Sequence, residues 1–389
     1  MKAATTKPDA DVSPVVPQPA VPERTGDNEP PYDTPFWLHF LGGLVHRYPR
    51  FWLRLGRLES RALETRTASI SLRMPIYVCG LARSGSTLLH EFVCSLPGVA
   101  THRIKDYPLV FTPYWWRRAT ANPRPQPPRE RPHRDGMMIT LDSPDAVEEM
   151  LWMAFFPRCH DPSASNLLRA EDSHPAFESF YHAHLRKLLL AEGATRYAAK
   201  NNYHVARLPY LVRQFPDARF LLPIRSPASH IASLMRQHEW FSAWHRQFPR
   251  TLAFMQWSGH FEFGLDRRPM HLGDDERVRR IRDAWAAGDE VRGLARYWDM
   301  VYDHLARLLD SDAQVRAAAL PVRFESIREQ PAETLRAVLE HCRLPDAEGI
   351  VERYAGAVRS PTSDPGRFSS HDLDAIREET AATAGRWGY

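Results

Sequence analysis

Short β-rich runs alternate with helical segments four times along this chain, and this alternation constrains the fold more than any other feature. The runs are PIYVCG (75–80), RYAAK (196–200), ARFLLPI (218–224) and LPVRF (320–324), and each precedes a stretch with helical character. Such alternation is typical of a parallel sheet covered by helices on both faces. We therefore expect a three-layer α/β fold with a central parallel sheet of about four to five strands.

The composition permits a folded core and limits the partners. Of the 389 residues, 43% are hydrophobic and 25% are charged, as in average globular proteins. Lys and Arg (51) barely exceed Asp and Glu (47), giving a net charge of +4. This excess fits a local site for an anionic ligand better than a nucleic-acid surface. The four cysteines lack CxxC spacing, so we expect them to be reduced and buried, with no zinc ribbon.

The chain divides into three parts. Residues 1–33 hold seven Pro in their first 31 positions, which predicts a disordered Pro-rich tail. Residues 34–73 predict two helices, broken near Pro49 and packed on the core; a membrane-surface contact by residues 36–66 is the alternative, because basic residues alternate there with Trp and Phe. Residues 74–389 predict the α/β domain. Neither a secretory signal nor a membrane-spanning run is found, which favours a cytoplasmic location.

Two stretches interrupt the alternation. Residues 107–142 are rich in Pro, Arg and Trp and predict an irregular segment across the surface. Residues 239–275 hold three Trp and five Phe among loop-type residues. Such insertions commonly form walls or lids over a ligand. A second hydrophobic core is the alternative explanation.

The turn after the first predicted strand is the strongest local motif. Gly80 and Gly85 permit a tight turn, Ser84, Ser86 and Thr87 add donors, and a helix follows. Backbone N–H groups at such a helix start favour a phosphate. The motif departs from a nucleotide-triphosphatase loop, because Ser86 stands where that loop requires Lys, and the basic residue is Arg83 within the turn. A turn without a ligand is the alternative.

A second motif follows the strand 218–224. Arg225 stands at the carboxyl end of that strand, and Ser233 follows two turns into the next helix. Carboxyl ends of parallel strands are where open α/β sheets bind ligands. Arg225 and Ser233 are therefore candidates to hold one further phosphate.

Together these residues resemble the sulfotransferase superfamily that uses 3′-phosphoadenosine 5′-phosphosulfate. RSGST (83–87) matches the family's first phosphate loop, RSPASHIAS (225–233) its second, and residues 297–345 continue in the family's order. Arg83, where cytosolic members have Lys, is similar to bacterial-type and Golgi branches. The resemblance implies a P-loop-like fold, the nucleotide as co-substrate without a metal, and transfer to a hydroxyl of a small-molecule, lipid or glycan acceptor. The family's basic motif near the C-terminus is absent, and Arg367 is its nearest counterpart.

The resemblance also implies a base that takes the acceptor's proton. Asp106 is the nearest acid after the first helix, His102 the nearest imidazole, and Glu148 or Glu149 the next candidates. A structural charge is the alternative for each. Lys200 stands where the family often has a strand-end Lys near the transferred group. Further residues could line the same edge or contact the acceptor: Asn201, Asn202, His204, Arg236, Gln237, His238, His260 and Glu262.

Two rival functions remain open at this point. One is a nucleotide-dependent kinase with the same layered fold, and the other is a module that binds a nucleotide without catalysis. The aromatic insertions favour a partly apolar acceptor, whose identity the sequence does not give, and the oligomeric state is open as well.

Overall fold

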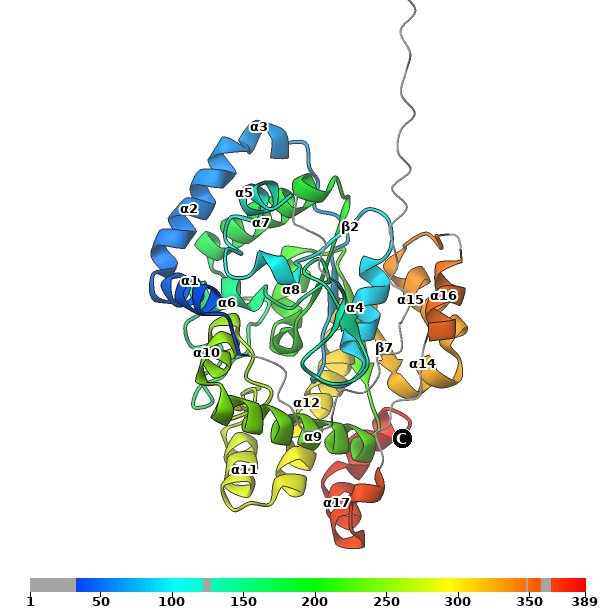
Figure 1. Cartoon of the computed structure of the whole chain (residues 1–389). Helices are drawn as coiled ribbons and strands as arrows, with labels where there is room; N and C mark the ends of the chain where they lie inside the picture. Colours follow the sequence, from blue (N-terminus) through cyan, green and yellow to red (C-terminus); the bar gives the residue numbers. More distant parts are fainter. Residues whose placement is uncertain (1–32, 122–126, 348, 358–364) are drawn as a thin grey trace, which may run out of the picture.

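A central five-stranded parallel sheet organises the molecule (Figure 1). The computed structural model describes residues 33–121, 127–347, 349–357 and 365–389. The strands, in spatial order, are β2 (Val99–Ala100), β5 (Arg196–Lys200), β1 (Ile76–Val78), β6 (Arg219–Ile224) and β7 (Ala319–Arg323). Every neighbouring pair is parallel. The expected α/β fold is confirmed; the two-residue edge strand β2 was not predicted.

Alternate strand residues enter two different cores. Ile76 and Val78 pack on one face with α4 (Ser86–Cys94) and α15 (Pro331–Cys342), whereas Tyr77 packs on the other with α7 (Pro175–Glu192). Side chains of a strand point to opposite faces in turn, so both faces of this sheet are apolar and need a helical cover. The sheet lies between two helical layers, with its carboxyl edge left for the loops.

The remaining elements complete those layers. They are α5 (Pro113–Ala119), α6 (Glu149–Phe155), α8 (Leu208–Gln214), α11 (Asp275–Ala286), α12 (Glu290–Ser311), α13 (Ala313–Ala318), α14 (Phe324–Glu329), α16 (Ile350–Ala357) and α17 (Ser370–Arg386), with 3-10 turns η1 (Ile104–Asp106), η2 (Asn202–Ala206) and η3 (Pro365–Arg367). All four cysteines are free; Cys94 is half-buried and the other three are buried.

The N-terminal segment forms α1 (Phe36–Arg47), α2 (Pro49–Ala62) and the short α3 (Glu64–Thr67), with the break at Tyr48. Buried Lys187 of α7 fixes α2, because its Nζ lies 2.8 Å from Glu59 and donates to the carbonyl of Gly56 at 3.0 Å. The expected tail lies outside the described residues except Asp33, whose carboxylate contacts Arg250. Within the described part of the chain, no helix combines the length and hydropathy that crossing a membrane requires.

The two interrupting stretches are more ordered than expected. The first contains α5 and an antiparallel hairpin, β3 (Arg129–Glu130) and β4 (Met138–Ile139), and its apolar start at Val110 and Phe111 is buried in the core. The second begins inside α9 (Pro227–Gln247) and continues as α10 (Pro249–Ser258), so only residues 259–274 are irregular. Burial of Phe241 and Trp244 on one face of α9 explains why the helix continues.

Candidate active site

The loop between β1 and α4 has the geometry of an anion site. Gly85 adopts φ +99°, and a Cβ there would lie 2.6 Å from the ring of Phe324, so only glycine fits this turn. Gly80 is equally confined, because a Cβ would lie 2.9 Å from the carbonyl oxygen of Pro223. No side chain caps α4. The free N–H groups of its first turn therefore face the loop and can bind an anion.

The second motif meets this loop directly. Arg225 donates from Nη1 to the carbonyl oxygen of Arg83 at 3.2 Å, across 142 residues of sequence. Arg83 in turn donates from Nε to Ser233 Oγ at 3.3 Å. Arg225 is buried over the ring of Phe324, 4.7 Å from its centroid. Burial, and then the nearby charge of Arg83, lowers the pKa of Arg225 to about 10, which is still a cation at neutral pH.

Two further cations converge on the same helix start. Lys200, at the end of β5, donates from Nζ to Thr87 Oγ1 at 3.3 Å, and Arg131 donates to the same oxygen at 3.1 Å. Burial, and then the charge of Arg131, lowers the pKa of Lys200. One turn along α4, burial raises the pKa of the Glu91 carboxyl to about 7 despite the charges of Arg131 and Lys200. Neither Arg131 nor Glu91 was anticipated from the sequence.

An internal carboxylate lies between the cations of the loop. Asp135 accepts from Arg83 Nη1 at 2.7 Å, from Arg131 Nε at 2.7 Å, and from Arg131 Nη2. Burial alone would raise the pKa of Asp135, but hydrogen bonds and charge from Arg131, then the charge of Arg83, hold it well below its ordinary value. The segment is fastened to α9, since Gln237 donates to the carbonyl of His133 at 2.9 Å. The β3–β4 hairpin thus places the Asp135 carboxylate, a negative charge, among the cations of the loop.

Asp106 and His102 have other partners. Asp106 is buried and accepts from Arg117 Nε at 3.0 Å, from Arg117 Nη2 at 2.5 Å and from the backbone N–H of Arg103 at 2.9 Å. Burial alone would raise its pKa, but hydrogen bonds from His102 and Arg117 lower it well below the ordinary value. His102, also buried, lies 3.2 Å from His184. The contacts of both residues are those of an ion-paired core.

Glu148 and Glu149 are equally enclosed. Glu148 accepts from Trp152 at 2.8 Å and from the hydroxyl of Tyr197, and lies 3.1 Å from His204. Burial alone would raise its pKa, but His204 first, with Trp152 and Tyr197, lowers it to about 2.

Glu149 receives both arms of Arg207, at 2.7 Å each. Ligand atoms of Glu149, Cys159 and His160 lie within 4.8 Å of one another, a spacing that a metal ion could use. The guanidinium of Arg207 already supplies the positive charge at this carboxylate, so we read the group as an ion-paired cluster.

Residues 259–274 bring a different acid–base pair to the loop. His260 Nδ1 lies 3.5 Å from Glu262, and Glu262 accepts from Asn202 at 2.7 Å. Burial opposes the charge on His260, yet the hydrogen bond and charge of Glu262 raise its pKa above the ordinary value; Asp145 raises it further and Lys200 lowers it. His260 keeps 25% of its side chain exposed, and Glu262 keeps 13%.

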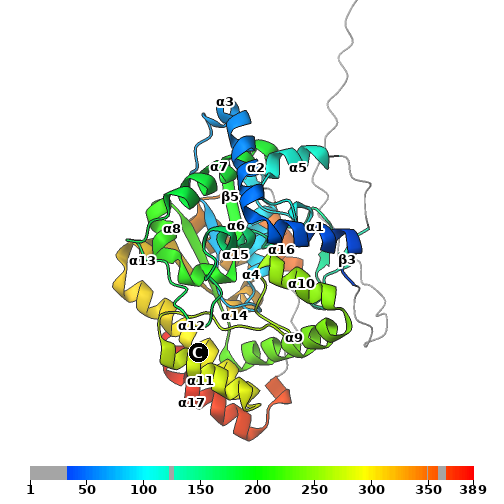
Figure 2. The ribbon, with the colours of Figure 1, turned by 90° about the vertical axis from the view of Figure 1, so that its left-hand side faces the viewer.

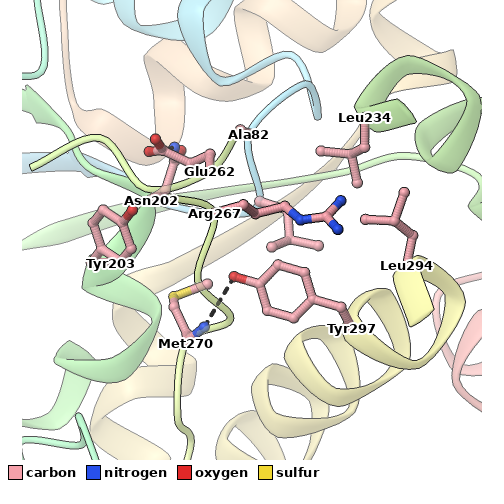
Figure 3. A pocket seen from close by; sticks show the side chains of 10 residues that line it. Ala82, Asn202, Tyr203, Leu234, Glu262, Arg267, Met270, Leu294 and Tyr297 are labelled. Atoms are coloured by element: carbon pink, nitrogen blue, oxygen red, sulfur yellow. Dashed lines mark hydrogen bonds between the residues drawn. The ribbon is translucent and has the colours of Figure 1, made fainter. Parts of the chain in front are cut away.

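A small cavity, about 10 Å³, lies beside this pair (Figure 3). Asn202 and Glu262 lie together at one end of it, close to Ala82 of the loop, while Tyr297 accepts the backbone N–H of Met270 at 3.3 Å. Arg267, Leu234 and Leu294 also line it. The irregular residues 259–274 therefore form a wall against the start of the loop.

The structure brings most of the expected donor-site residues together. Arg225, Arg83 and Ser233 form one group of contacts, and Lys200 and Thr87 form a second. Arg131 and Asp135 connect the two groups. Arg367 donates instead to Glu239 of α9 at 2.7 Å on the surface. Among the described residues, Arg367 forms no hydrogen bond with the loop 80–87, and we leave it out of the site.

An open parallel sheet, a helix start with free N–H groups and a second basic motif beside it define an α/β protein with a candidate site for an anionic ligand. The sequence profile of the Sulfotransferase family matches residues 75–282, more than half of the chain. The chain belongs to this family, and it is an enzyme of sulfuryl transfer. The activity therefore uses an activated sulfate donor and a hydroxyl-bearing acceptor.

Several solved structures are similar. Sulfotransferase STF1 from Mycobacterium tuberculosis H37Rv has 17% identity and a TM-score of 0.44, covering 88% of this chain and 86% of that chain. Sulfotransferase STF9 from Mycobacterium avium has 14% identity and a TM-score of 0.46, covering 84% and 80%. A sulfotransferase from Alicyclobacillus acidocaldarius has 12% identity and a TM-score of 0.38, covering 81% and 94%. A comparison with curated protein sequences found no match.

Proposed function

We propose that the enzyme transfers the sulfuryl group of 3′-phosphoadenosine 5′-phosphosulfate to an alcohol or phenol. The proposal rests on one observation, the direct contact between Arg225 and the loop residue Arg83. This donor carries phosphates at two ends of one nucleoside. Two basic motifs that are distant in sequence and adjacent in space suit such a molecule, whereas ATP carries its phosphates in one chain.

Each motif has its own task in this proposal. The N–H groups of the loop and of α4 bind the 5′-phosphosulfate, and Arg225 with Ser233 binds the 3′-phosphate. The acceptor oxygen forms a bond to sulfur while the bond from sulfur to the bridging phosphate oxygen breaks. Negative charge then develops on the departing phosphate. Arg83, Arg131 and Lys200 stabilise that charge, because all three cations lie at the same helix start.

The acceptor's proton must pass to a base, and we assign that base to His260. Neutral Nε2 of His260 is the accepting atom, and Glu262 at Nδ1 orients the ring and stabilises the imidazolium that forms. Asp106 and Glu148, expected from the sequence, already accept hydrogen bonds from buried cationic or neutral donors. Glu91, close to Lys200 and with a pKa near 7, is the second candidate.

Nucleotide binding tests the donor assignment. Calorimetry should show tighter binding of 3′-phosphoadenosine 5′-phosphate than of ATP or of adenosine 5′-phosphate. Arg225→Ala should remove about 1.5–3 kcal/mol of the preference for the 3′-phosphate, roughly ten- to a hundredfold. Arg219→Ala, at the opposite end of the same strand, is the matched control and should keep it. Equal affinity of the parent enzyme for ATP would refute the assignment.

A further inference from the structure

The outward face of α1 and α2 is apolar to an extent found nowhere else in the described residues. Of the residues that the structure describes, seven large hydrophobic ones have strongly exposed side chains, and six of these belong to α1, α2 or their junction. These six, here called the hairpin patch, are Phe36, Trp37, Phe40, Tyr48, Phe51 and Leu58, each 52–69% exposed. Isolated exposed hydrophobics need no explanation, but a cluster of this size marks an interaction surface.

Positive charge surrounds the hairpin patch. Arg47, Arg50, Arg54, Arg57 and Arg61 are exposed on the same two helices. Within the described parts of the chain, none of these five guanidinium groups forms an ion pair with a carboxylate. Glu59 is buried against Lys187, and the next exposed acid along the chain is Glu64 of α3. The surface therefore combines aromatic side chains with uncompensated cationic ones.

The helical repeat arranges the two kinds of side chain in parallel. Phe51 and Leu58, seven residues apart, lie on one line of α2, and the arginines at positions 50, 54, 57 and 61 form the neighbouring stripe. The opposite face of α2 is fixed, because Gly56 lies against Phe111 and Phe180. Figures 1 and 2 show α1 and α2 as the outermost layer on their side of the molecule. The hairpin patch is therefore the stable outer face of packed helices.

We infer that this face docks the enzyme on an anionic membrane surface. Aromatic side chains among arginines are the pattern of helices that lie in the headgroup region, where the rings enter the acyl boundary and the cations meet anionic lipids. A second copy of the chain is a less suitable partner for the hairpin patch, because a two-fold symmetric contact would place the arginine stripe of one copy against that of the other. A nucleic acid would match the arginines and leave the six apolar side chains uncovered.

Docking would also place the bilayer near the wall that carries His260. Trp257 of α10 lies under α1, with its ring 4.8 Å from His39 and 6.0 Å from His46. Helix α10 ends at Ser258, two residues before His260. Helix α10 thus joins the helices of the hairpin patch to the wall formed by residues 259–274. Docking itself does not depend on the proposed function.

Vesicle co-sedimentation with the full chain tests the inference. The protein should sediment with phosphatidylcholine vesicles containing about one third phosphatidylserine, remain in solution with pure phosphatidylcholine, and dissociate in about 0.5 M salt, where the Debye length falls to a few ångströms. Two variants, Phe36→Ser/Trp37→Ser/Phe40→Ser and Arg54→Glu/Arg57→Glu, should each reduce the bound fraction at least tenfold. Both change exposed side chains only, and thermal melts confirm folding.

The matched control is Arg282→Glu/Arg377→Glu, which makes the same charge change on α11 and α17, at the other end of both views (Figures 1 and 2). It should bind vesicles like the parent. Failure of the parent to bind anionic vesicles, or equal binding by all variants, would overturn the inference. A dimer in solution that only the apolar variant dissociates, without vesicle binding, would assign the face to a second copy. Binding of 3′-phosphoadenosine 5′-phosphate is measured on every variant, so that failure of docking and failure of the proposed function are separated.

Discussion

Replacing Asp135 by Asn should strengthen donor binding while weakening the unliganded fold. The Asp135 carboxylate accepts three hydrogen bonds from Arg83 and Arg131, the same cations that we assign to the donor's anionic group. An incoming phosphosulfate must therefore share these cations with a resident carboxylate. The Asn side chain keeps the size of Asp and removes its charge.

The contacts set the expected magnitude. A hydrogen bond to a charged group contributes about 1.5–3 kcal/mol. If the donor takes over one of the bonds now made to Asp135, its affinity in Asp135→Asn should rise by about ten- to a hundredfold. The low pKa of Asp135 in the folded chain means that its ionised form stabilises the fold at neutral pH. The unliganded variant should accordingly melt a few degrees below the parent.

Calorimetry with 3′-phosphoadenosine 5′-phosphate and a thermal melt without it give the two readouts. Asp142→Asn is the control, because Asp142 lies in the same segment and pairs with Lys105 on the surface, where 55% of its side chain is exposed. That variant should change both quantities little. Weaker donor binding by Asp135→Asn would refute the idea that the Asp135 carboxylate competes with the donor for these cations. Asp135 would then be a residue that positions Arg83 and Arg131.

Four further predictions concern catalysis and stability. His260 must be neutral to accept a proton, and Glu262 raises its pKa, so kcat/KM should fall as pH drops through that pKa. Glu262→Gln should move this acidic limb of the pH profile to lower pH. If the limb does not move and Glu91→Gln loses turnover instead, the role of the base passes to Glu91. Asp106→Asn should lower the melting temperature, since buried Arg117 loses one of its two carboxylate partners and keeps only Glu192, but should retain turnover per folded molecule. Loss of turnover with an unchanged melt would restore Asp106 as the base. Glu148 has its pKa lowered to about 2, so the stability it contributes is present above pH 4.5 and lost as pH falls toward 2, and acid unfolding of Glu148→Gln should depend less on pH over that window. Gly85→Ala should abolish nucleotide binding in calorimetry, because its Cβ would meet Phe324 and φ +99° strains any side chain, whereas Gly193→Ala, also at positive φ but with nothing near its Cβ, should bind normally.

Sequence patterns predicted those parts of the fold that local chemistry determines. Three of the predicted strand runs contain β1, β5 and β6, and the run 320–324 overlaps β7 but is shifted by one residue, since β7 is Ala319–Arg323. A buried parallel strand is a short continuous apolar run, which makes it recognisable. Strand β2 has only two residues, too few for a pattern. The composition of residues 239–247 predicts a loop, whereas α9 continues through Gln247, because Phe241 and Trp244 form a buried helix face there.

The candidate site also contains residues that a local sequence pattern predicts and residues that it does not. The loop 80–87 and Arg225 carry their signal in glycine spacing and in their position after a strand, so the sequence predicts each of them as an anion-binding motif. Arg131 and Asp135 reach the loop from an inserted hairpin, and no local spacing specifies where an insertion folds back. Sequence position favours Asp106 and Glu148 as bases, yet each has a buried partner more than ten residues away, Arg117 and His204, that the sequence does not reveal.

During synthesis of the chain, the N-terminal helices are made long before α10, the helix on which α1 packs. Contacts of the first described residues with α10, such as Thr34 Oγ1 to Thr251 Oγ1 at 3.3 Å, join positions 217 residues apart. A ribosome adds about 5–20 residues per second, so the partner helix follows roughly 10–40 s after α1. Until α10 is made, the inner face of α1 lacks this partner helix, and the nascent chain presents it to the cell together with the aromatic, arginine-rich outer face. A chaperone, or an anionic bilayer close to the ribosome, would be the first surface available to cover it.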